Sequence, residues 1–372
     1  MSLIAEEMED IPEPEFGISD NLTLSQCPSL TEYQFDLLLV SCFLLEGVLQ
    51  IILSLLGILG NIVSIFLLTR PELRSCFNQL LAVLASYDLL YLFTMMMESV
   101  KKLGLETWIQ IQLFPYILHP LNSVAMTGSI FMTIAVARER YIAVFQPIFY
   151  HKLRNDKGTH CMRILKYFIP ITFFSVSFNL PKFFEITVAQ DGNGTVFNDV
   201  TDLRTNHFYI TYYHSWLRLI VIGILPFIII SVMNIKIYMA VKQRKNKGGD
   251  KDHLSLILIM IVTTFVVCNL LQLFLNMHEI FILDDIQTCR DTPLGGFPVW
   301  SIFCGFISHV LLVINSSANL FIYCIIGSQF RKKLCSYFSL PQCVHQLLRR
   351  DQEPPNPNVK EGPHTREEEH KF

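Results

Sequence analysis

Glu139, Arg140 and Tyr141 lie at the end of a long apolar stretch, Phe114 to Val136. An acid beside an arginine at the edge of such a stretch is costly unless the pair has a use. A partly buried ion pair stabilises a protein only modestly, because desolvation offsets attraction, so the pair suits one arm of a switch. The alternatives are a surface salt bridge at a helix end, or an Arg140 side chain that reaches lipid headgroups.

Asp88 is a second ionisable group in an apolar stretch, in the middle of the run from Leu80 to Met97. A carboxylate without partners at that depth of a bilayer is expensive, so polar side chains are expected to contact it. The alternative to a charged carboxylate is a protonated Asp88 in a hydrogen-bonded polar core.

The composition places these residues in a membrane protein. Of the 372 residues, 51% are hydrophobic and only 16% are charged, whereas a soluble domain carries about a quarter. A helix that spans a bilayer needs about 20 mostly apolar residues. The candidate stretches are Leu37–Leu68, Leu80–Met97, Phe114–Val144, Ile164–Phe184, Ile210–Ala240, Leu254–Leu283 and Val299–Ile326. The predicted fold is an all-α membrane protein with a seven-helix bundle, because irregular chain cannot face lipid.

Lys and Arg are concentrated in every second connection between these stretches, which is typical of the cytoplasmic side. These residues are Arg70, Arg74, Lys152, Arg154, Lys157, Arg163, Lys166, Lys242, Arg244, Lys245, Lys247, Lys251, Arg331, Lys332 and Lys333. The alternation predicts a multi-pass plasma-membrane protein with its amino terminus outside the cell. We expect an acidic extracellular segment over 1–36 and the seven-helix domain over 37–326. Sequons at Asn21 and Asn193 fall on the predicted outer side and are expected to carry glycans.

Short motifs resemble those of rhodopsin-like (class A) G-protein-coupled receptors, from about Gly57 to Phe338. The matching segments are Gly60-Asn61, Leu84-Ala85-Ser86-Tyr87-Asp88, Glu139-Arg140-Tyr141, Pro226 and Asn319-Leu320-Phe321-Ile322-Tyr323. A narrower resemblance is to invertebrate FMRFamide-type neuropeptide receptors. It is carried by Asn179-Leu180-Pro181-Lys182-Phe183-Phe184-Glu185, Asn276-Met277-His278-Glu279 and Ile314-Asn315-Ser316-Ser317-Ala318-Asn319. The resemblance implies a receptor that binds an extracellular RFamide-type neuropeptide and activates a heterotrimeric G protein.

The resemblance also gives the first ionisable site a role. Arg140 is expected to pair with neighbouring Glu139 in the inactive state. When the cytoplasmic end opens, Arg140 turns to the G protein and Tyr323 moves toward it. Tyr141 and Asn319 belong to the same motifs and are expected to take part in the switch.

Around Asp88 the resemblance places Asn61, Ser129, Asn315 and Asn319. These oxygen-bearing side chains suit a hard cation, and in the family this cluster binds sodium. An allosteric sodium ion is the only bound cofactor that we expect, and the alternative is a polar core without an ion.

The chain departs from the family pattern at several positions. Pro115 occupies the region of the cysteine that ordinarily ties the third helix to the second outer loop, and that loop, 185–214, has no cysteine. The sixth stretch reads Cys268-Asn269-Leu270-Leu271-Gln272, without tryptophan or proline. We therefore expect the sixth helix to move as a rigid body, or through the polar segment from Asn269 to Gln272.

An RFamide ligand predicts an acidic pocket, because its arginine would pair with a carboxylate in a partly dry site. The candidate pocket residues are Glu98, His119, Asn122, Glu185, His214, Glu279 and His309. Glu98 and Glu279 are the first choices, since both should lie in the outer third of the bundle. The alternative for each is a structural ion pair with Lys101, Lys102 or Lys182.

Cysteines mark both ends of the predicted bundle. Cys27 and Cys289 lie in outer soluble segments and are expected to form a disulfide, with two free thiols as the alternative. Residues 327–340 resemble an amphipathic eighth helix on the inner membrane surface, where Cys335 or Cys343 carries palmitate or stays unmodified. The cytoplasmic tail, 341–372, is rich in Pro and Glu and is expected to be mostly disordered, with arrestin as a further partner.

Other classes of protein are disfavoured. The sequence has no Walker loop, zinc triad or nucleophile elbow, so we expect neither an enzyme nor a nucleic-acid partner. A membrane transporter would show several mid-membrane charges and internal repeats, and neither is evident. Within receptors, the alternative ligand is a small molecule or a lipid-like signal.

Overall fold

The computed structural model describes residues 27, 30–73, 75–155, 159–192, 194–246, 253–289, 292 and 294–338. The sequons at Asn21 and Asn193, Cys343 and the disordered tail over 341–372 fall outside the described residues, and so does most of the predicted acidic segment over 1–36.

Within the described residues, seven helical segments are long and apolar enough to cross a membrane, as the sequence predicted. The first span consists of α2 (Glu32–Ser41), a π-helical segment (Cys42–Leu49) and α3 (Gln50–Leu68). The second is α4 (Cys76–Lys102), and the third consists of α5 (Trp108–Leu113), a π-helical segment (Phe114–Leu118) and α6 (His119–Phe145).

The fourth span consists of α8 (Thr159–Phe178) and a 3-10 segment (Leu180–Phe184). The fifth has two π-helical segments (Tyr209–Leu217, Leu219–Ile224) and α10 (Leu225–Asn246). The sixth is α11 (His253–Phe281), and the seventh consists of α13 (Val299–Ser317) and α14 (Asn319–Ile326). The shorter elements are a 3-10 turn (Pro71–Leu73), α7 (Pro147–Asn155), α9 (Asp202–Thr205), α12 (Leu283–Thr288), α15 (Ser328–Phe338), β1 (Ile186–Gln190) and β2 (Val196–Val200).

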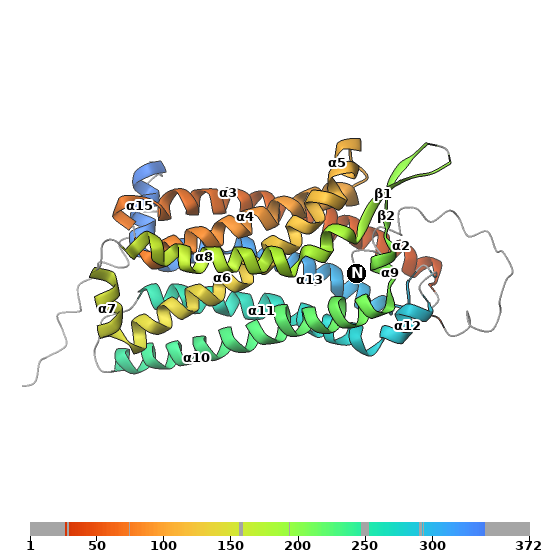
Figure 1. Ribbon diagram of the computed structural model, residues 1–372. Helices are drawn as coiled ribbons and strands as arrows, with labels where there is room; N and C mark the ends of the chain where they lie inside the picture. The colour runs from red at the N-terminus through yellow and green to blue at the C-terminus, as the bar shows by residue number, and fades with distance from the viewer. Residues whose placement is uncertain are drawn as a thin grey trace, which may run out of the picture.

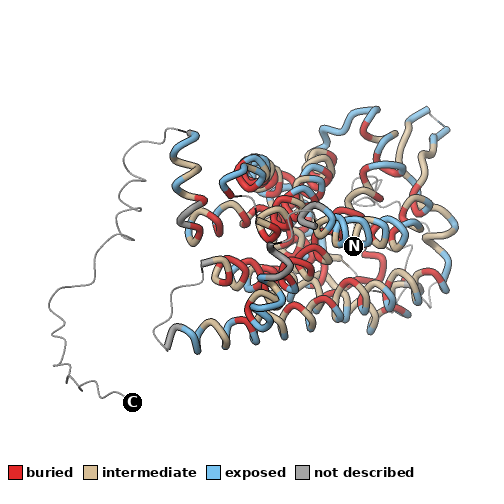
Figure 2. The backbone as a smooth tube through the Cα atoms, turned by 60° about the vertical axis from the view of Figure 1, so that its left-hand side comes forward, coloured by how far each residue is buried: buried red, intermediate tan, exposed pale blue. Residues whose placement is uncertain are grey.

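The spans run side by side in one elongated bundle with short elements at its two ends (Figure 1). One end carries β1, β2, α9 and α12, and we call it the hairpin end. The opposite end carries α7 and α15, and we call it the α15 end. Buried residues are concentrated where the helices face one another, and exposed residues lie on the outside (Figure 2).

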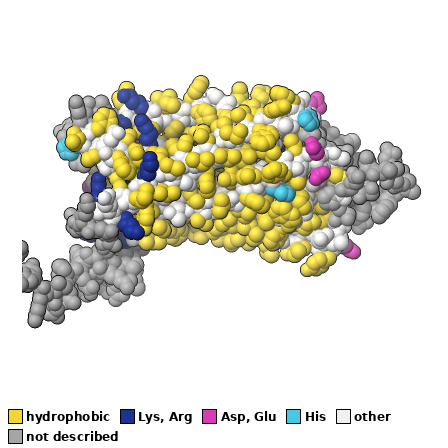
Figure 3. All heavy atoms as spheres, turned by 90° about the horizontal axis from the view of Figure 1, so that it is seen from below, with side chains coloured by type: hydrophobic (Ala, Val, Ile, Leu, Met, Phe, Trp, Pro, Cys, Tyr) yellow, Lys and Arg dark blue, Asp and Glu magenta, His cyan; other side chains and the backbone are white. Residues whose placement is uncertain are grey.

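The outside of the bundle is apolar over most of its length (Figure 3). Exposed side chains such as Ile62, Phe173 and Val267 belong to this surface. On the face shown, Lys and Arg gather toward the α15 end, whereas Asp and Glu lie toward the hairpin end. An apolar belt between two polar ends is what a lipid bilayer requires of a spanning bundle.

Helix α4 packs between α3 and α6 and forms the centre of the bundle. Gly128 of α6 permits this close approach, because a Cβ atom there would lie 2.2 Å from the Tyr87 ring. Tyr87 belongs to the main buried apolar cluster, together with Leu84 and Met132. Its hydroxyl also bonds to the Thr172 hydroxyl of α8 at 2.7 Å, which joins the fourth span to this core.

Several helices extend beyond the predicted stretches; α4, for example, runs from Cys76 to Lys102 and not from Leu80 to Met97. Two further differences concern the first and the seventh span. The first helix begins earlier, at Glu32, because Thr31 forms a capping box with Gln34. The hydropathy pattern placed the start of this helix too late, at Leu37, because the first turn of the helix is polar. The seventh span was predicted as one helix, but it is divided at Ala318 into α13 and α14.

A β-hairpin follows the fourth span, and the sequence did not predict it. The strands are antiparallel, with Ile186 opposite Val200 and Gln190 opposite Val196. The turn depends on Gly194, because its φ of +85° is readily adopted only by glycine. The hairpin forms one wall of the hairpin end and places Glu185, just before β1, against the helices.

Candidate functional site

A cavity of about 210 Å³ lies among the helices toward the hairpin end. It is lined by six of the seven predicted pocket residues: Glu98, His119, Asn122, His214, Glu279 and His309. These side chains come from α4, α6, the fifth span, α11 and α13, which are far apart in the sequence. The structure therefore brings the predicted residues together, and Glu185 lies behind the cavity wall in contact with His119 and His214.

Glu98 of α4 and Glu279 of α11 are the acidic groups of the cavity wall. Neither takes part in an ion pair among the described residues. The predicted alternative, a structural pair with a neighbouring lysine, is therefore not formed there. Two carboxylates in a partly enclosed space favour a cationic group on a ligand.

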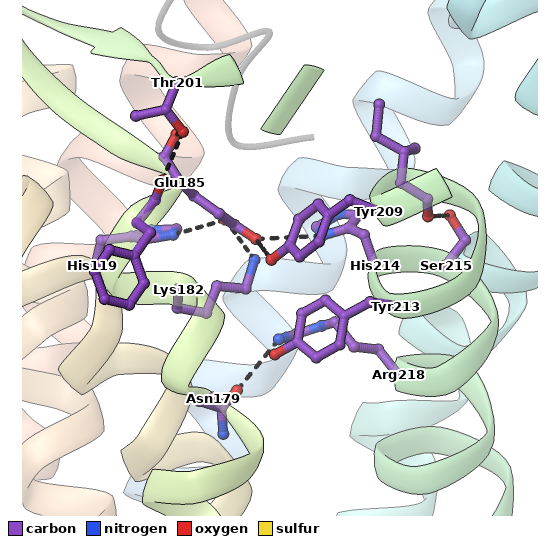
Figure 4. A network of polar contacts seen from close by, with 12 residues as sticks. His119, Asn179, Lys182, Glu185, Thr201, Tyr209, Tyr213, His214, Ser215 and Arg218 are labelled. Atoms are coloured by element: carbon purple, nitrogen blue, oxygen red, sulfur yellow. Dashed lines mark hydrogen bonds and ion pairs between the residues drawn. The ribbon is translucent and has the colours of Figure 1, made fainter. Parts of the chain in front are cut away.

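Glu185 is buried at the start of the loop after the fourth span, among donors from three segments (Figure 4). Lys182 Nζ donates to its Oε2 at 2.8 Å, and the Tyr209 hydroxyl donates to its Oε1 at 2.6 Å. His119 Nε2 lies 3.2 Å from Oε2, and His214 Nδ1 lies 3.8 Å from Oε1.

The charge of Glu185 is fixed by these neighbours. Burial raises the pKa of the Glu185 carboxyl, but Lys182 and the other surrounding groups outweigh burial and hold this pKa well below its usual range. Both oxygens already have partners, and Glu185 does not line the cavity. Glu185 therefore positions the cavity wall, and a direct contact between Glu185 and a ligand stays a prediction.

Sequence reasoning missed several polar residues of the cavity wall, among them Lys182, Arg218, Gln272 and Asn276. Arg218 had a usable signal, because it is the sole arginine within the apolar stretch Ile210–Ala240. An ionisable side chain inside a span is by default a functional candidate. The two amides had no comparable signal, since their role depends on which side of α11 faces the cavity.

His309 is held by Glu46, a buried acid of the first span that also escaped the sequence analysis. A Glu46 carboxylate oxygen contacts His309 Nδ1, and the other lies 3.8 Å from Cys42 Sγ. Glu46 is 5% exposed, so this contact is shielded from solvent. The pair positions the His309 ring at the cavity and ties the first span to α13.

Asp88 lies in the middle of the bundle and is 1% exposed. Ser129 Oγ donates to its Oδ1 at 2.6 Å, and Asn319 Nδ2 donates to its Oδ2 at 2.7 Å. Asn61, predicted in the same cluster, donates instead to two backbone oxygens at 2.9 and 3.0 Å. Asn315 makes no hydrogen bond to Asp88 within the described residues, so the predicted cluster is only partly assembled.

At the α15 end, Glu139 pairs with Arg163 of α8 and not with Arg140 as predicted. Arg163 Nη2 donates to Glu139 Oε2 at 2.9 Å, and Glu139 is fully buried. The Arg140 guanidinium lies over the Phe77 ring, 3.5 Å from its centroid. The resemblance did not reveal this partner, because α8 brings Arg163 to the carboxylate from a distant part of the chain.

Seven spans that carry these two ionisable sites match a known family. The family model for the 7 transmembrane receptor (rhodopsin family) matches residues 60–326. The chain belongs to this family. The family is one of receptors and not a class of enzymes.

Three proteins with similar sequences agree with this family. The FMRFamide receptor of Drosophila melanogaster is 32% identical over 315 residues, which are 77% of this chain and 52% of that protein. The chain thus spans about half the length of this relative. The probable G-protein coupled receptor frpr-1 of Caenorhabditis elegans is 26% identical, over 82% of this chain and 80% of the relative. The FMRFamide peptide receptor frpr-18 of the same species is 24% identical, over 76% and 67%.

Tyr323 of the receptor is 1% exposed, and its hydroxyl has no hydrogen-bond partner among the described residues. Its ring packs against Phe330, 5.5 Å between centroids. A buried hydroxyl without a partner is costly. The hydroxyl is therefore available for a partner in another arrangement of the bundle. Tyr141 is stacked on Phe145 and lies apart from this contact.

The Asp88 site of the receptor supplies part of the oxygen set that a sodium ion needs. The Asp88 carboxylate and the Ser129 hydroxyl provide oxygens, whereas Asn319 presents its nitrogen. The side-chain oxygen of Asn61 is buried without a hydrogen-bond partner among the described residues. These residues fit an ion held by Asp88 and Ser129, and the participation of Asn61 and Asn315 stays a prediction.

Cys27 and Cys289 of the receptor form a disulfide, as the sequence suggested. It joins the residues just before the first span to the loop after α12. At the opposite end, α15 lies where the sequence placed the eighth helix, and it carries Cys335 in a half-buried position. Attachment of α15 to a membrane and palmitoylation of Cys335 stay predictions.

Proposed function

We propose that this receptor binds peptides that end in arginine followed by an amidated phenylalanine, and that it activates a heterotrimeric G protein in response. The names of two relatives refer to FMRFamide, which is such a peptide. The observation that carries the proposal is the pair of unmatched carboxylates, Glu98 and Glu279, at one cavity. A peptide arginine is the complementary group, because a guanidinium binds a carboxylate through two hydrogen bonds.

The orientation follows from the charges. Basic side chains gather toward the α15 end, which should therefore be cytoplasmic, and the hairpin end should face outside the cell (Figure 3). The cavity then opens to an extracellular peptide at a plasma membrane, and Arg140 lies at the side where the G protein binds.

We extend this proposal to three further partners: arrestin at the cytoplasmic side, membrane lipid beneath α15, and a sodium ion at Asp88. Comparing agonist affinity in sodium and in N-methylglucamine chloride, with Asp88→Asn as control, tests the ion.

The volume of the cavity limits what part of a peptide it holds. Pockets for drug-sized ligands usually measure about 300–1,000 Å³, and this cavity measures about 210 Å³. It fits the last residues of a peptide, with the rest at the hairpin end, and it equally fits a small cationic molecule. A small cationic ligand is therefore the second candidate.

Removing one negative charge at a time tests the proposal. Glu98→Gln and Glu279→Gln should each lower the potency of FMRFamide by about tenfold or more, which corresponds to about 1.4 kcal/mol. Asp284→Asn is the matched control, because Asp284 is an exposed acid of α12 that does not line the cavity. Unchanged potency in both cavity variants would remove these carboxylates from the site. A wild-type receptor that is activated by a small cationic molecule but by no peptide would favour the small cationic ligand.

A further inference from the structure

Lys182 and Arg218 both line the cavity, but only one of them has an acidic partner. Lys182 pairs with Glu185 at 2.8 Å. None of the ion pairs among the described residues includes Arg218. A guanidinium presents five N–H donors, and leaving them unsatisfied inside a span is costly. The wall formed by the fifth span therefore carries an unmatched positive charge.

The contacts that Arg218 makes hold it in place without neutralising it. Its Nη1 donates to Asn179 Oδ1 at 3.3 Å (Figure 4). Asn179 is fully buried, and its Nδ2 donates to Thr127 Oγ1 at 2.9 Å and to the Ser175 backbone oxygen at 2.8 Å. These bonds fix the amide with its oxygen toward Arg218. The Tyr213 hydroxyl is a second neutral neighbour of the guanidinium.

The cavity is consequently polarised. Its unmatched carboxylates, Glu98 and Glu279, belong to α4 and α11, whereas its unmatched cation, Arg218, belongs to the fifth span. A ligand that satisfies all three must present a cation and a hydrogen-bond acceptor close together. The arginine and the terminal carbonyl oxygen of an amidated Arg-Phe peptide are separated by a single residue and meet this requirement.

We propose that Arg218 is a subsite for the carbonyl oxygen of the ligand's carboxy-terminal amide, held in place by Asn179. This inference rests on the proposed function, because it assumes that the peptide arginine lies at Glu98 and Glu279. A hydrogen bond from a guanidinium to a carbonyl oxygen is charge-assisted and stronger than a neutral one. Arg218 thus orients the peptide end, while the carboxylates select its charge.

The test is a cycle of two receptors and two peptides, in cells that express the full chain. The receptors are wild type and Arg218→Gln. The peptides are Phe-Met-Arg-Phe-NH₂ and the same peptide ending in phenethylamide, which lacks only the terminal carboxamide. On the wild type, loss of the carboxamide should lower potency about tenfold. On Arg218→Gln, the two peptides should be equipotent within about threefold, because the partner of the carbonyl is already gone.

Controls separate this coupling from a folding defect. Arg138→Gln removes an arginine that contacts Tyr167 near the α15 end, and it should leave both potencies unchanged. Where Arg218→Gln fails to reach the cell surface, Arg218→Lys replaces it. Lysine keeps a cation but loses the fork of donors, so the effect of the carboxamide should shrink without vanishing.

The outcomes distinguish the two proposals. A full carboxamide effect on the Arg218 variants as on the wild type would overturn the subsite and leave the proposed function standing. A wild-type receptor that responds to neither peptide would overturn the proposed function and the subsite with it.

Discussion

Glu185 shows how one buried carboxylate can take over the work of a covalent link. The family resemblance predicts a cysteine near the outer end of the third helix that would bond to the second outer loop, but this chain has Pro115 in that region. Here His119 of α6 and Tyr209 of the fifth span converge on Glu185 instead. The next residue, Ile186, packs on the third span in a small apolar cluster. Polar and apolar contacts thus hold the hairpin on the bundle.

Glu185→Gln should destabilise the receptor strongly, because it leaves Lys182 buried without a counter-charge. Breaking one side of a buried ion pair costs about 3–5 kcal/mol. The thermal unfolding of the purified receptor measures this loss, with Asp199→Asn, a change at an exposed acid of β2, as the matched acid-to-amide control.

The pH dependence of stability is a second measure of the same contact. The pKa of Glu185 is lowered on folding, so the stability that Glu185 contributes is complete above the unfolded pKa of about 4.3 and is lost progressively as pH falls below this value. A wild-type advantage that stays constant below that pH would contradict this account.

Tyr323→Phe should separate stability from signalling. Within the described part of the chain the hydroxyl has no hydrogen-bond partner, so its removal should leave the melting temperature unchanged or raise it by the equivalent of about 1 kcal/mol. Signalling should fall if the hydroxyl finds its partner only in the active arrangement. Tyr87→Phe is the contrast, because that hydroxyl bonds to Thr172 and its loss should lower stability. A clear loss of stability in Tyr323→Phe would contradict the assignment.

The sequence predicted which residues line the candidate site better than it predicted which residues contact one another. An acid or histidine in an apolar stretch is visible in the sequence, and this placed Glu98, Glu279 and His309 at the cavity. Partners depend on which spans meet, so neither Arg163 beside Glu139 nor Glu46 beside His309 could be foreseen. The sequence also could not show that Glu185 would be saturated by its neighbours.

At the scale of elements, α11 has no proline over its whole length, His253–Phe281. Polar side chains link it to the seventh span instead. Ser308 Oγ of α13 donates to Gln272 Oε1 at 2.7 Å, and Gln272 Nε2 donates to Asn276 Oδ1 at 2.7 Å. Among the residues that the structure describes, the Asn269 side chain bonds only within its own helix, to the Phe265 oxygen at 2.8 Å. Of the polar segment from Asn269 to Gln272, Gln272 is therefore the residue that connects α11 to α13.

Gln272→Leu should raise signalling in the absence of ligand, because it removes the contact that holds α11 to α13. The loss of the Ser308 bond is worth about 1 kcal/mol, or roughly a fivefold shift between two arrangements. Ligand-free G-protein activation measures the shift. Asn269→Leu is the matched control and should change little. Equal basal signalling in wild type and Gln272→Leu would exclude this contact from the switch.

Hydropathy located all seven spans, because burial in lipid demands long apolar runs. It could not locate the β-hairpin, which depends on cross-strand pairing and on Gly194, or the division of the seventh span at Ala318. These features are set by local backbone geometry and packing and leave no apolar period in the sequence.

At the scale of the whole molecule, contacts between distant segments fix both ends of the bundle. The Cys27–Cys289 disulfide links positions 262 residues apart at the hairpin end. Beside it, Leu38 of α2 packs on Leu294 and Phe297 of the last loop. At the other end, Lys333 Nζ of α15 lies 3.6 Å from a Glu72 carboxylate oxygen.

Removing the disulfide by the paired change Cys27→Ser and Cys289→Ser should lower the stability of the receptor by about 2–4 kcal/mol. Peptide affinity should fall as well, because the loop after α12 connects α11 and α13, two walls of the cavity. Thermal unfolding and peptide binding measure the two effects. Cys304→Ser, a free cysteine of α13, is the control. Unchanged unfolding in the paired variant would show that the bond does not stabilise the fold.

We expect Glu98 and Glu279 together to bind the positively charged arginine of an Arg-Phe-amide peptide. The most direct measurement is the potency of FMRFamide against the same peptide with citrulline, a neutral isostere, in place of arginine. On the wild-type receptor the citrulline peptide should be weaker by about a hundredfold, or about 2.7 kcal/mol. On the double variant Glu98→Gln and Glu279→Gln this difference should disappear. Equal potency of the two peptides on the wild type, or an undiminished difference on the double variant, would contradict the claim.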